Sequence, residues 1–453
     1  MVRGNTNRNI NRLELIMIVD NKNYVRDALT EHLRNVVEKQ VEERYRSLSY
    51  YEGMPSEMEK DLGKYFPIKT LEIPMVCQNI TSKLVNARAI GYKDPPQRTN
   101  DDYLDSVHEL DQTMITAERL TYLLGSHLIR SRYDEADGLI HYDQIIEFEP
   151  IFEPRARDPF AYIFPLYNHG YTRDQDCVYA YWSEEEHYLI HQTGRVESVN
   201  DGNVNPYGIL PFTIIHRHPY TTDFIRAGAY DILNANLMVN LLMTELGLAM
   251  RLQALGQPVI AGVDQMSNVS LGVDKPMVLP EGASFSFESP GGNLEQYINS
   301  IRFYVDSVAY NNNLKVKWSV GRESFISGEA LKMAEIDLTE AVMADYQMIW
   351  RGAEQHRFEV DRMILETHGK RIPEEFSCDF SEPRFPLSAT EERAQWDWEW
   401  ANNLSSPKDW LRKYNPDLEE DEIEAMAEEL SVGPTPEVEQ ESPGNILLGA
   451  LES

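Results

Sequence analysis

Two histidines on either side of one arginine form the most metal-like fragment of the sequence, His216-Arg217-His218. On a β-strand alternate residues share one face, so both imidazoles could meet one zinc ion. A catalytic zinc site uses three protein ligands, however, and the spacing marks no third one. The fragment is therefore either part of a metal-dependent hydrolase that uses His216 and His218 or, more simply, a strand edge with two ordinary histidines. His187 and His191 form a similar pair.

The common catalytic and cofactor-binding motifs are missing from the sequence. There is no GxxxxGK[ST] loop, no GxGxxG after an expected strand, no HExxH and no GxSxG. The three cysteines, Cys77, Cys177 and Cys378, lie far apart and form no CxxC pair, which argues against a cysteine-rich zinc site. We expect no enzymatic activity, no cofactor and no bound metal.

One basic segment stands out in an acidic chain. No acid occurs from Ser307 to Arg322, where Lys315, Lys317 and Arg322 accompany Trp318. The segment is either an ordinary exposed loop between two helices or a mobile loop that touches phosphate groups by charge alone.

The charge balance restricts the possible partners. The 453 residues include 42 Lys and Arg against 74 Asp and Glu, a net charge of −32. Non-specific coating of duplex DNA needs many cationic contacts, and an anionic membrane surface would repel this chain. No run of about 18 apolar residues occurs, so we expect no membrane contact. After Lys413 there is no Lys or Arg, and residues 417–441 hold eleven acids.

Apolar periodicity predicts a mixed α+β fold. Helices are expected over 22–48, 79–90, 112–132, 223–254, 293–313 and 327–368. An antiparallel β region of five or six strands is expected over 138–218, with strands at 144–148, 161–164, 178–182, 187–191 and 212–216. Short β-like runs fill 257–291. Ser388 with Glu391, and Ser406 with Pro407, predict two smaller helices, and 417–430 is an acidic helix candidate.

Two local patterns each allow two interpretations. Trp396, Trp398 and Trp400 alternate along an expected helix. They are either packed inside a small subdomain or part of a subunit contact, where Trp is enriched. Gly352 lies inside the long helix and permits either a kink or a close helix contact.

The order of these elements, over about residues 22–433, resembles the portal proteins (head–tail connectors) of tailed bacteriophages. Three stretches carry the resemblance. Asp223-Phe224-Ile225 through Asp231-Ile232-Leu233-Asn234-Ala235, after a strand at Pro211-Phe212, resembles the first stem helix. Ser327-Gly328-Glu329-Ala330-Leu331-Lys332 resembles the start of the long kinked helix after the tunnel loop. Ser406-Pro407-Lys408-Asp409-Trp410 with Asn415-Pro416-Asp417-Leu418 resembles the crown.

The resemblance implies a division of the chain into nine parts. They are an N-terminal arm (1–21), a wing (22–222), a first stem helix (223–255), a clip (256–291), a second stem helix (292–313), a tunnel loop (314–327), a long wing helix with a return segment (328–386), a crown (387–433) and a flexible acidic tail (434–453). The crown is short, and no long C-terminal helical barrel follows it.

The resemblance also implies a function without catalysis. The chain would form a homo-oligomeric ring, usually of twelve copies, at one capsid vertex, and conduct double-stranded DNA during packaging and ejection. Its partners would be the large terminase, head–tail adaptor proteins and the major capsid protein. It would reside in the virion, and in the host cytoplasm during assembly. The tunnel loop would place Lys315, Lys317, Trp318 and Arg322 in the DNA channel, and the clip would offer Met277, Leu279, Phe285 and Phe287 to partners.

A third interpretation is a purely structural scaffold whose long helices pair as a coiled coil. That pairing requires sustained heptads. Gln347, Gly352 and Gln355 interrupt the apolar seam of 328–368.

Overall fold

The computed structural model divides the chain into two units. One comprises Met1–Val320 and Ala334–Arg384, and the other comprises Gly321–Met333 and Phe385–Ser453. The structure describes residues 37–66, 74–153, 155–166, 178–191, 195–219, 223–255, 257–261, 282, 284–288, 294–316, 336–381, 389–402, 404–414, 422–424 and 426–427. The mixture of helices and sheets confirms the predicted α+β class.

Two antiparallel sheets form the β region. The first has the order β3-β2-β9, and the second runs from β4 to β8 in sequence order. The bounds are β2 Ser126–Asp134, β3 Leu139–Ile145, β4 Glu149–Ile151, β5 Ala161–Leu166, β6 Val178–Ser183, β7 His187–His191, β8 Val196–Ser198 and β9 Phe212–His216. Among the described residues of 138–218 there are therefore seven strands, β3 to β9, where five or six were expected, and β2 precedes this region. Strands β7 and β9 have the predicted bounds, and the strand expected at 144–148 instead ends at Ile145.

The helix expected over 112–132 is wrong in its second half. Helix α7 spans Leu110–Leu124, and β2 begins at Ser126. Gly125 separates them with a φ of 78°, a conformation that favours glycine. A Cβ on Gly125 would lie 2.3 Å from the carbonyl oxygen of Ala227, so a side chain would also clash there. The chain thus changes from helix to strand where another segment crosses it.

That crossing segment explains the second correction. Helix α8 was expected from residue 223 but spans Tyr230–Leu255. The Arg226 amide donates to Ser126 Oγ (2.8 Å) and the Ala229 amide to the Leu123 carbonyl (2.9 Å). These bonds hold the backbone outside helical geometry, and Gly228 permits an approach that a Cβ, at 2.1 Å from Leu123 O, would block.

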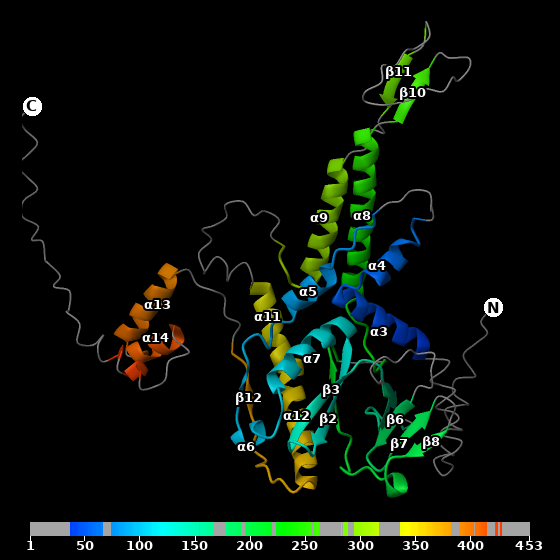
Figure 1. Ribbon diagram of the computed structural model, residues 1–453. Coiled ribbons are helices and arrows are strands. Elements are labelled where there is room, and N and C mark those ends of the chain that lie inside the picture. Colours follow the sequence, from blue (N-terminus) through cyan, green and yellow to red (C-terminus); the bar gives the residue numbers. More distant parts are fainter. Residues whose placement is uncertain are drawn as a thin grey trace, which may run out of the picture. The chain divides into compact units, whose positions relative to one another are not determined.

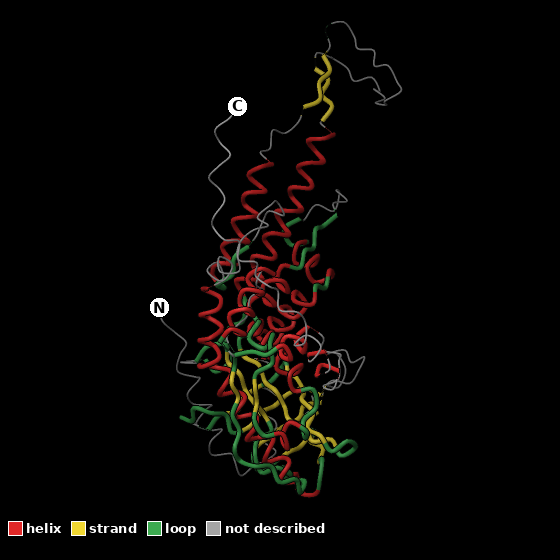
Figure 2. The backbone as a smooth tube through the Cα atoms, turned by 90° about the vertical axis from the view of Figure 1, so that its left-hand side faces the viewer, coloured by secondary structure: helices red, strands yellow, loops and turns green. Residues whose placement is uncertain are grey.

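Helices α8 and α9 (Leu294–Asn311) pack side by side (Figures 1 and 2). Between them in the chain lies an antiparallel hairpin of β10 (Gln257–Ala261) and β11 (Ser284–Glu288). By length and composition, Tyr230–Arg251 could cross a membrane, although 44% of that window is buried within the protein. The absence of membrane contact stays a prediction.

Amide side chains on successive turns of α8 hold an extended segment. Asn236 Oδ1 accepts from the amides of Ile80 (2.7 Å) and Thr81 (2.9 Å), and Asn240 Oδ1 accepts from Gln78 (2.9 Å). One turn further, Thr244 Oγ1 accepts from the amide of Val76 (3.0 Å). Three residues spaced by four thus satisfy backbone donors that no helix or sheet serves.

The remaining elements of this unit are short helices and one further pair of strands. Helix α5, predicted over 79–90, spans Ile80–Arg88, and the Asn79 side chain caps it by accepting from Ser82 N. The helix predicted over 22–48 is described from residue 37 and ends at Glu52. The other bounds are α3 Val37–Glu52, α4 Pro55–Leu62, β1 Gln97–Arg98, α6 Asp101–Leu104 and β12 Cys378–Asp379, which pairs with β1.

The long helix is continuous from Ile336 to Thr367. It consists of α11 (Ile336–Asp345), a π-helical turn (Tyr346–Trp350) and α12 (Arg351–Thr367). Gly369, with a φ of 80°, follows its end as predicted. Among the described residues, nothing lies within 4 Å of a Cβ placed on Gly352, so the structure shows no close helix contact at this glycine. The irregularity lies in the preceding turn.

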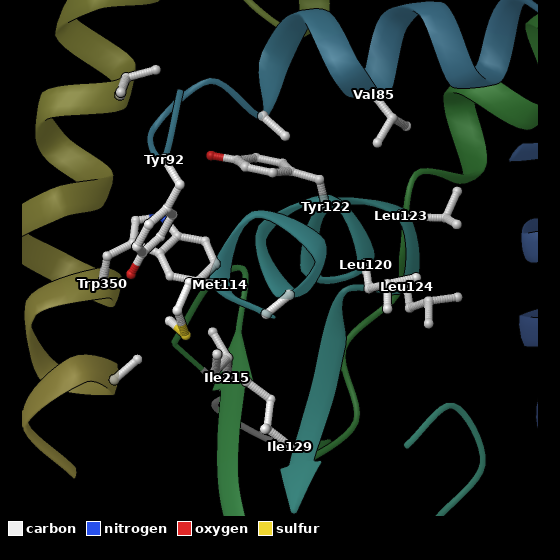
Figure 3. Packing of buried hydrophobic residues seen from close by; sticks show 14 of the residues in the cluster. Val85, Tyr92, Met114, Leu120, Tyr122, Leu123, Leu124, Ile129, Ile215 and Trp350 are labelled. Atoms are coloured by element: carbon white, nitrogen blue, oxygen red, sulfur yellow. The ribbon is translucent and has the colours of Figure 1, made fainter. Parts of the chain in front are cut away.

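One hydrophobic core joins these elements. Figure 3 shows Met114, Leu120 and Tyr122 of α7 gathered with Val85 of α5 and Trp350 of the long helix. Ile129 of β2 and Ile215 of β9 close the cluster from the sheet.

The second unit contains α13 (Ala389–Ala401) and α14 (Pro407–Tyr414). Helix α14 begins with the predicted proline, and Ser406 and Asp409 form a reciprocal cap, with Ser406 N donating to Asp409 Oδ2 at 2.8 Å. Trp398 and Trp400 are each 60% exposed, so packing inside the subdomain is wrong for these two. Trp396 is half-buried, with the Lys413 ammonium 5.5 Å from its ring centre.

Candidate functional site

The structure does not bring His216 and His218 together as strand neighbours. Strand β9 ends at His216, whose Nδ1 is hydrogen-bonded to Ser126 Oγ at 2.9 Å, and His218 lies beyond the strand, exposed. Burial, with Arg226 nearby, lowers the pKa of His216 to about 4. Among the described residues, no three His, Cys, Asp or Glu side chains are grouped to hold a metal ion. This geometry does not support the hydrolase interpretation.

His187 and His191 have separate structural partners. His187 Nδ1 donates to the Tyr181 carbonyl (3.0 Å) and its ring stacks on Trp182, with 3.6 Å between ring centres. Burial lowers the pKa of His187. His191 Nε2 binds Glu197 at 2.9 Å. Neither imidazole is available to complete a shared site.

The basic segment is described only at its start. Lys315 follows α9, and its Nζ lies 3.6 Å from Asp337 Oδ2 on the first turn of α11. Both side chains are about half exposed, so this ion pair is weak and can open readily. Lys317, Trp318 and Arg322 lie outside the described residues.

The predicted clip is a β-hairpin in its described part. Phe285 is paired with Ile260, and Phe287 with Pro258, in the β10–β11 register. Phe285 is half-buried. Met277, Leu279 and the side chain of Phe287 lie outside the described residues. The hairpin follows directly on one helix and leads into the other, as the clip would.

Exposed apolar side chains on the helical hairpin were not among the predicted sites. On α9, Phe303 is 69% and Tyr310 is 79% exposed. Seven residues apart, they share one face of the helix. Ile298 on α9 and Met250 on α8 are also exposed. Clustered exposed apolar groups indicate protein contact, and the seven-residue spacing was a signal present in the sequence.

A buried ionic centre was also missed. Arg357, Glu354 and Asp361 project from α12 with side chains fully buried, and Arg357 pairs with both acids. Arg98 Nη2 adds a contact to Glu354 at 2.8 Å, and the hydroxyl of Tyr103 donates to Asp361 at 2.7 Å. Burial opposes ionisation of Glu354, but the adjacent arginines outweigh it and lower the pKa of this carboxyl. The i, i+3 and i, i+4 spacing of these three residues is visible in the sequence, but the sequence does not show that their side chains are buried.

A second polar cluster joins α7 to the long helix. The Glu118 carboxylate accepts from the amides of Gly91 (2.8 Å) and Tyr92 (3.2 Å). Burial raises the pKa of Glu118 to about 7 despite these bonds. Nearby, Asp345 pairs with Arg88 at 2.7 Å and accepts from the Tyr122 hydroxyl. The charged groups of both clusters have partners within the chain, and their burial keeps them away from a substrate.

Comparison with known proteins gives distant structural likeness only. No protein-family model and no curated protein matches the sequence. A chain from the neck of an empty gene transfer agent particle, computed with C6 symmetry, has a TM-score of 0.42 and 11% identity, covering 79% of this chain and 93% of that one. A chain of the native gene transfer agent virion gives 0.40 and 11%, covering 74% and 89%. One from the native particle's neck, computed with C12 symmetry, gives 0.41 and 11%, covering 79% and 90%. Scores at this level do not establish a shared fold.

Proposed function

We propose that this protein is a portal subunit that forms a ring at a capsid vertex and conducts double-stranded DNA. The observation that carries the proposal is the helical hairpin. Helix α8 has 26 residues and α9 has 18; they pack together, lead into and out of a small β-hairpin, and expose apolar side chains. This chain order supports the proposal because it matches the stem and clip that the sequence resemblance implies.

The exposed residues of the hairpin fit a ring better than a monomer. A closed ring uses a heterologous interface, in which two different surfaces of each copy meet. Phe303 and Tyr310 supply one apolar surface, and burying each against a neighbour would stabilise the ring by about 1.5–3 kcal/mol. Their large exposure in the single chain supports such a neighbour.

The charge distribution suits a channel through which DNA slides. Strong cationic binding would retain the DNA, whereas a net charge of −32 per copy discourages adhesion. The segment holding Lys315, Lys317 and Arg322 would touch the phosphates weakly. The hairpin of β10 and β11 would meet the large terminase and, later, head–tail adaptors.

The mass of the purified protein tests the ring. Light scattering with negative-stain imaging of the same peak should give rings with a central hole. Twelve copies of 52.3 kDa would give about 630 kDa. A stable monomer in the presence of capsid and scaffold proteins would contradict the proposal.

Charge removal tests the DNA path. Replacing Lys315, Lys317 and Arg322 by Ala should leave ring formation intact and impair packaging or retention of DNA. The matched control replaces three basic residues elsewhere, Lys60, Lys93 and Arg195, all exposed. Normal packaging by the first variant would refute the loop assignment while leaving the ring assignment standing.

A further inference from the structure

The buried face of the long helix does not follow an α-helical period. Val342, Tyr346, Trp350 and Glu354 are all buried, at a constant spacing of four. An α-helix turns about 100° per residue, so three such steps would rotate the stripe by about 120°. A straight α-helix could not bury all four on one side.

The π-helical turn removes that rotation. Within Tyr346–Trp350 the hydrogen bonds span five residues, and the Arg351 amide donates to the Tyr346 carbonyl. A π turn of this kind accommodates one residue more than an α-helical turn. On its outer side Gln347 and Met348 are exposed, Met348 by 69%. The turn therefore stores one extra residue on the solvent side.

Contacts to one short segment hold the turn in this register. The Tyr346 hydroxyl donates to the Gly91 carbonyl (3.0 Å), and Trp350 packs edge-on against Tyr92 with ring centres 5.4 Å apart. Just before the turn, Asp345 pairs with Arg88. Each contact joins the turn to residues 88–92.

The two sides of the turn are held unequally. Helix α12 is anchored through its buried acids: Glu354 pairs with Arg98 (2.8 Å), and Asp361 accepts from the hydroxyls of Tyr103 (2.7 Å) and Tyr142 (2.6 Å). Helix α11 buries Leu338, Thr339 and Val342, and its last residue, Asp345, makes its charged contact to residues 88–92, while the pair of Asp337 with Lys315 is about half exposed. Loss of the Asp345 contact frees the less anchored side.

We propose that Tyr346–Trp350 is a register switch. In the observed state the extra residue is held in the π turn; in the second state the turn becomes α-helical and α11 rotates by about 100° relative to α12. The Arg88–Asp345 pair selects the observed state. The switch is a property of the single chain and does not depend on the portal assignment.

Paired deletions test whether the turn stores an extra residue. Deleting Met348 places Glu354 eleven positions after Val342 instead of twelve, which is close to three full α-helical turns, so both buried faces stay aligned. We expect the Tm to stay within about 4 °C of the wild type. The control deletes exposed Gln355, in regular helix, which separates Glu354 from Arg357 in rotation, and should lower the Tm by more than about 8 °C. Equal losses from the two deletions would overturn the stored-residue assignment.

Spin-label distances test the switch itself. Labels at Met343→Cys on α11 and Lys93→Cys beside the anchoring segment are placed in a chain whose three cysteines are alanine. In the chain that keeps Met348, Asp345→Asn should add a second label-to-label distance that differs from the first by several Å. In the chain that lacks Met348, Asp345→Asn should add no second distance. Asp337→Asn, on the same helix, is the matched control and should keep one distance. A single unchanged distance in the Asp345→Asn protein would overturn the switch, as would a second distance that survives deletion of Met348.

Discussion

The ionic centre of α12 and the helical hairpin of α8 and α9 differ in which kinds of side chain they bury and which they expose. Around Arg357 the chain buries two acids and an arginine at 0% exposure and supplies each with partners. On α9 it leaves Phe303 and Tyr310 more than two-thirds exposed. Charge is therefore inside and apolar surface outside, the reverse of the usual distribution in a soluble monomer.

The contrast distinguishes what holds the chain together from what it offers to partners. A buried ion pair costs desolvation energy and is retained only with good geometry, so the centre at Arg357 is internal structure. An exposed aromatic pair on one helix face gains free energy only when another surface covers it. The first region should determine stability and the second association.

The largest expected effect follows from opening the ionic centre. Arg357→Met leaves Asp361 buried without a cation and Glu354 with Arg98 alone, and should destabilise the protein by about 3–5 kcal/mol. The denaturation midpoint of the purified chain measures it.

The matched control lies on the same helix. Arg351 pairs with Asp379 at 2.9 Å but is about half exposed, so Arg351→Met should cost at most about 1 kcal/mol. Comparable losses from the two variants would mean that burial does not distinguish these ion pairs, and the contrast between the regions would fail.

A smaller effect comes from Glu118, whose buried carboxyl has a pKa of about 7 against an ordinary 4.5. The folded protein keeps this proton while the unfolded chain releases it, so stability falls as pH rises from 4.5 to 7. Glu118→Gln should remove up to about 3 kcal/mol of that fall. Unfolding measured at several pH values gives the slope. Buried His127, with a pKa of about 3, acts oppositely in both proteins and cancels in the difference. If the stability of the wild type and that of Glu118→Gln changed with pH by the same slope, the raised pKa of Glu118 would be contradicted.

Local patterns were sufficient to predict much of the fold. Short runs rich in Ile, Tyr and Phe at 187–191 and 212–216 located β7 and β9, and Ser406-Pro407 located the start of α14. Two helix boundaries were wrong for one reason. Gly125 and Gly228 lie where residues 226–229 cross the end of α7, and this tertiary contact replaces helix with extended chain. Periodicity within either segment does not contain that information.

The site residues were less predictable. Spacing suggested His216 and His218, but the end of β9 separates them, and a strand end depends on pairing with β2. The basic segment was recognised by composition, yet only Lys315 lies among the described residues. The π turn had a readable signal, the constant spacing of four from Val342 to Glu354, which an α-helical period does not explain.

The smallest expected change in stability accompanies the clearest expected change in assembly. Phe303→Ser with Tyr310→Ser alters two exposed side chains and should shift the free energy of unfolding by no more than about 0.5 kcal/mol per residue. The same variant should fail to form rings, because the apolar face that would meet the neighbouring copy is lost. Tyr65→Ser with Val204→Ser is the control, since both residues are also more than half exposed but lie outside the hairpin. Light scattering and denaturation on the same preparations separate the outcomes. Rings of unchanged mass would remove this face of α9 from the interface. A large loss of stability would show that Phe303 and Tyr310 support the fold of the single chain, and the two regions would then no longer differ in role.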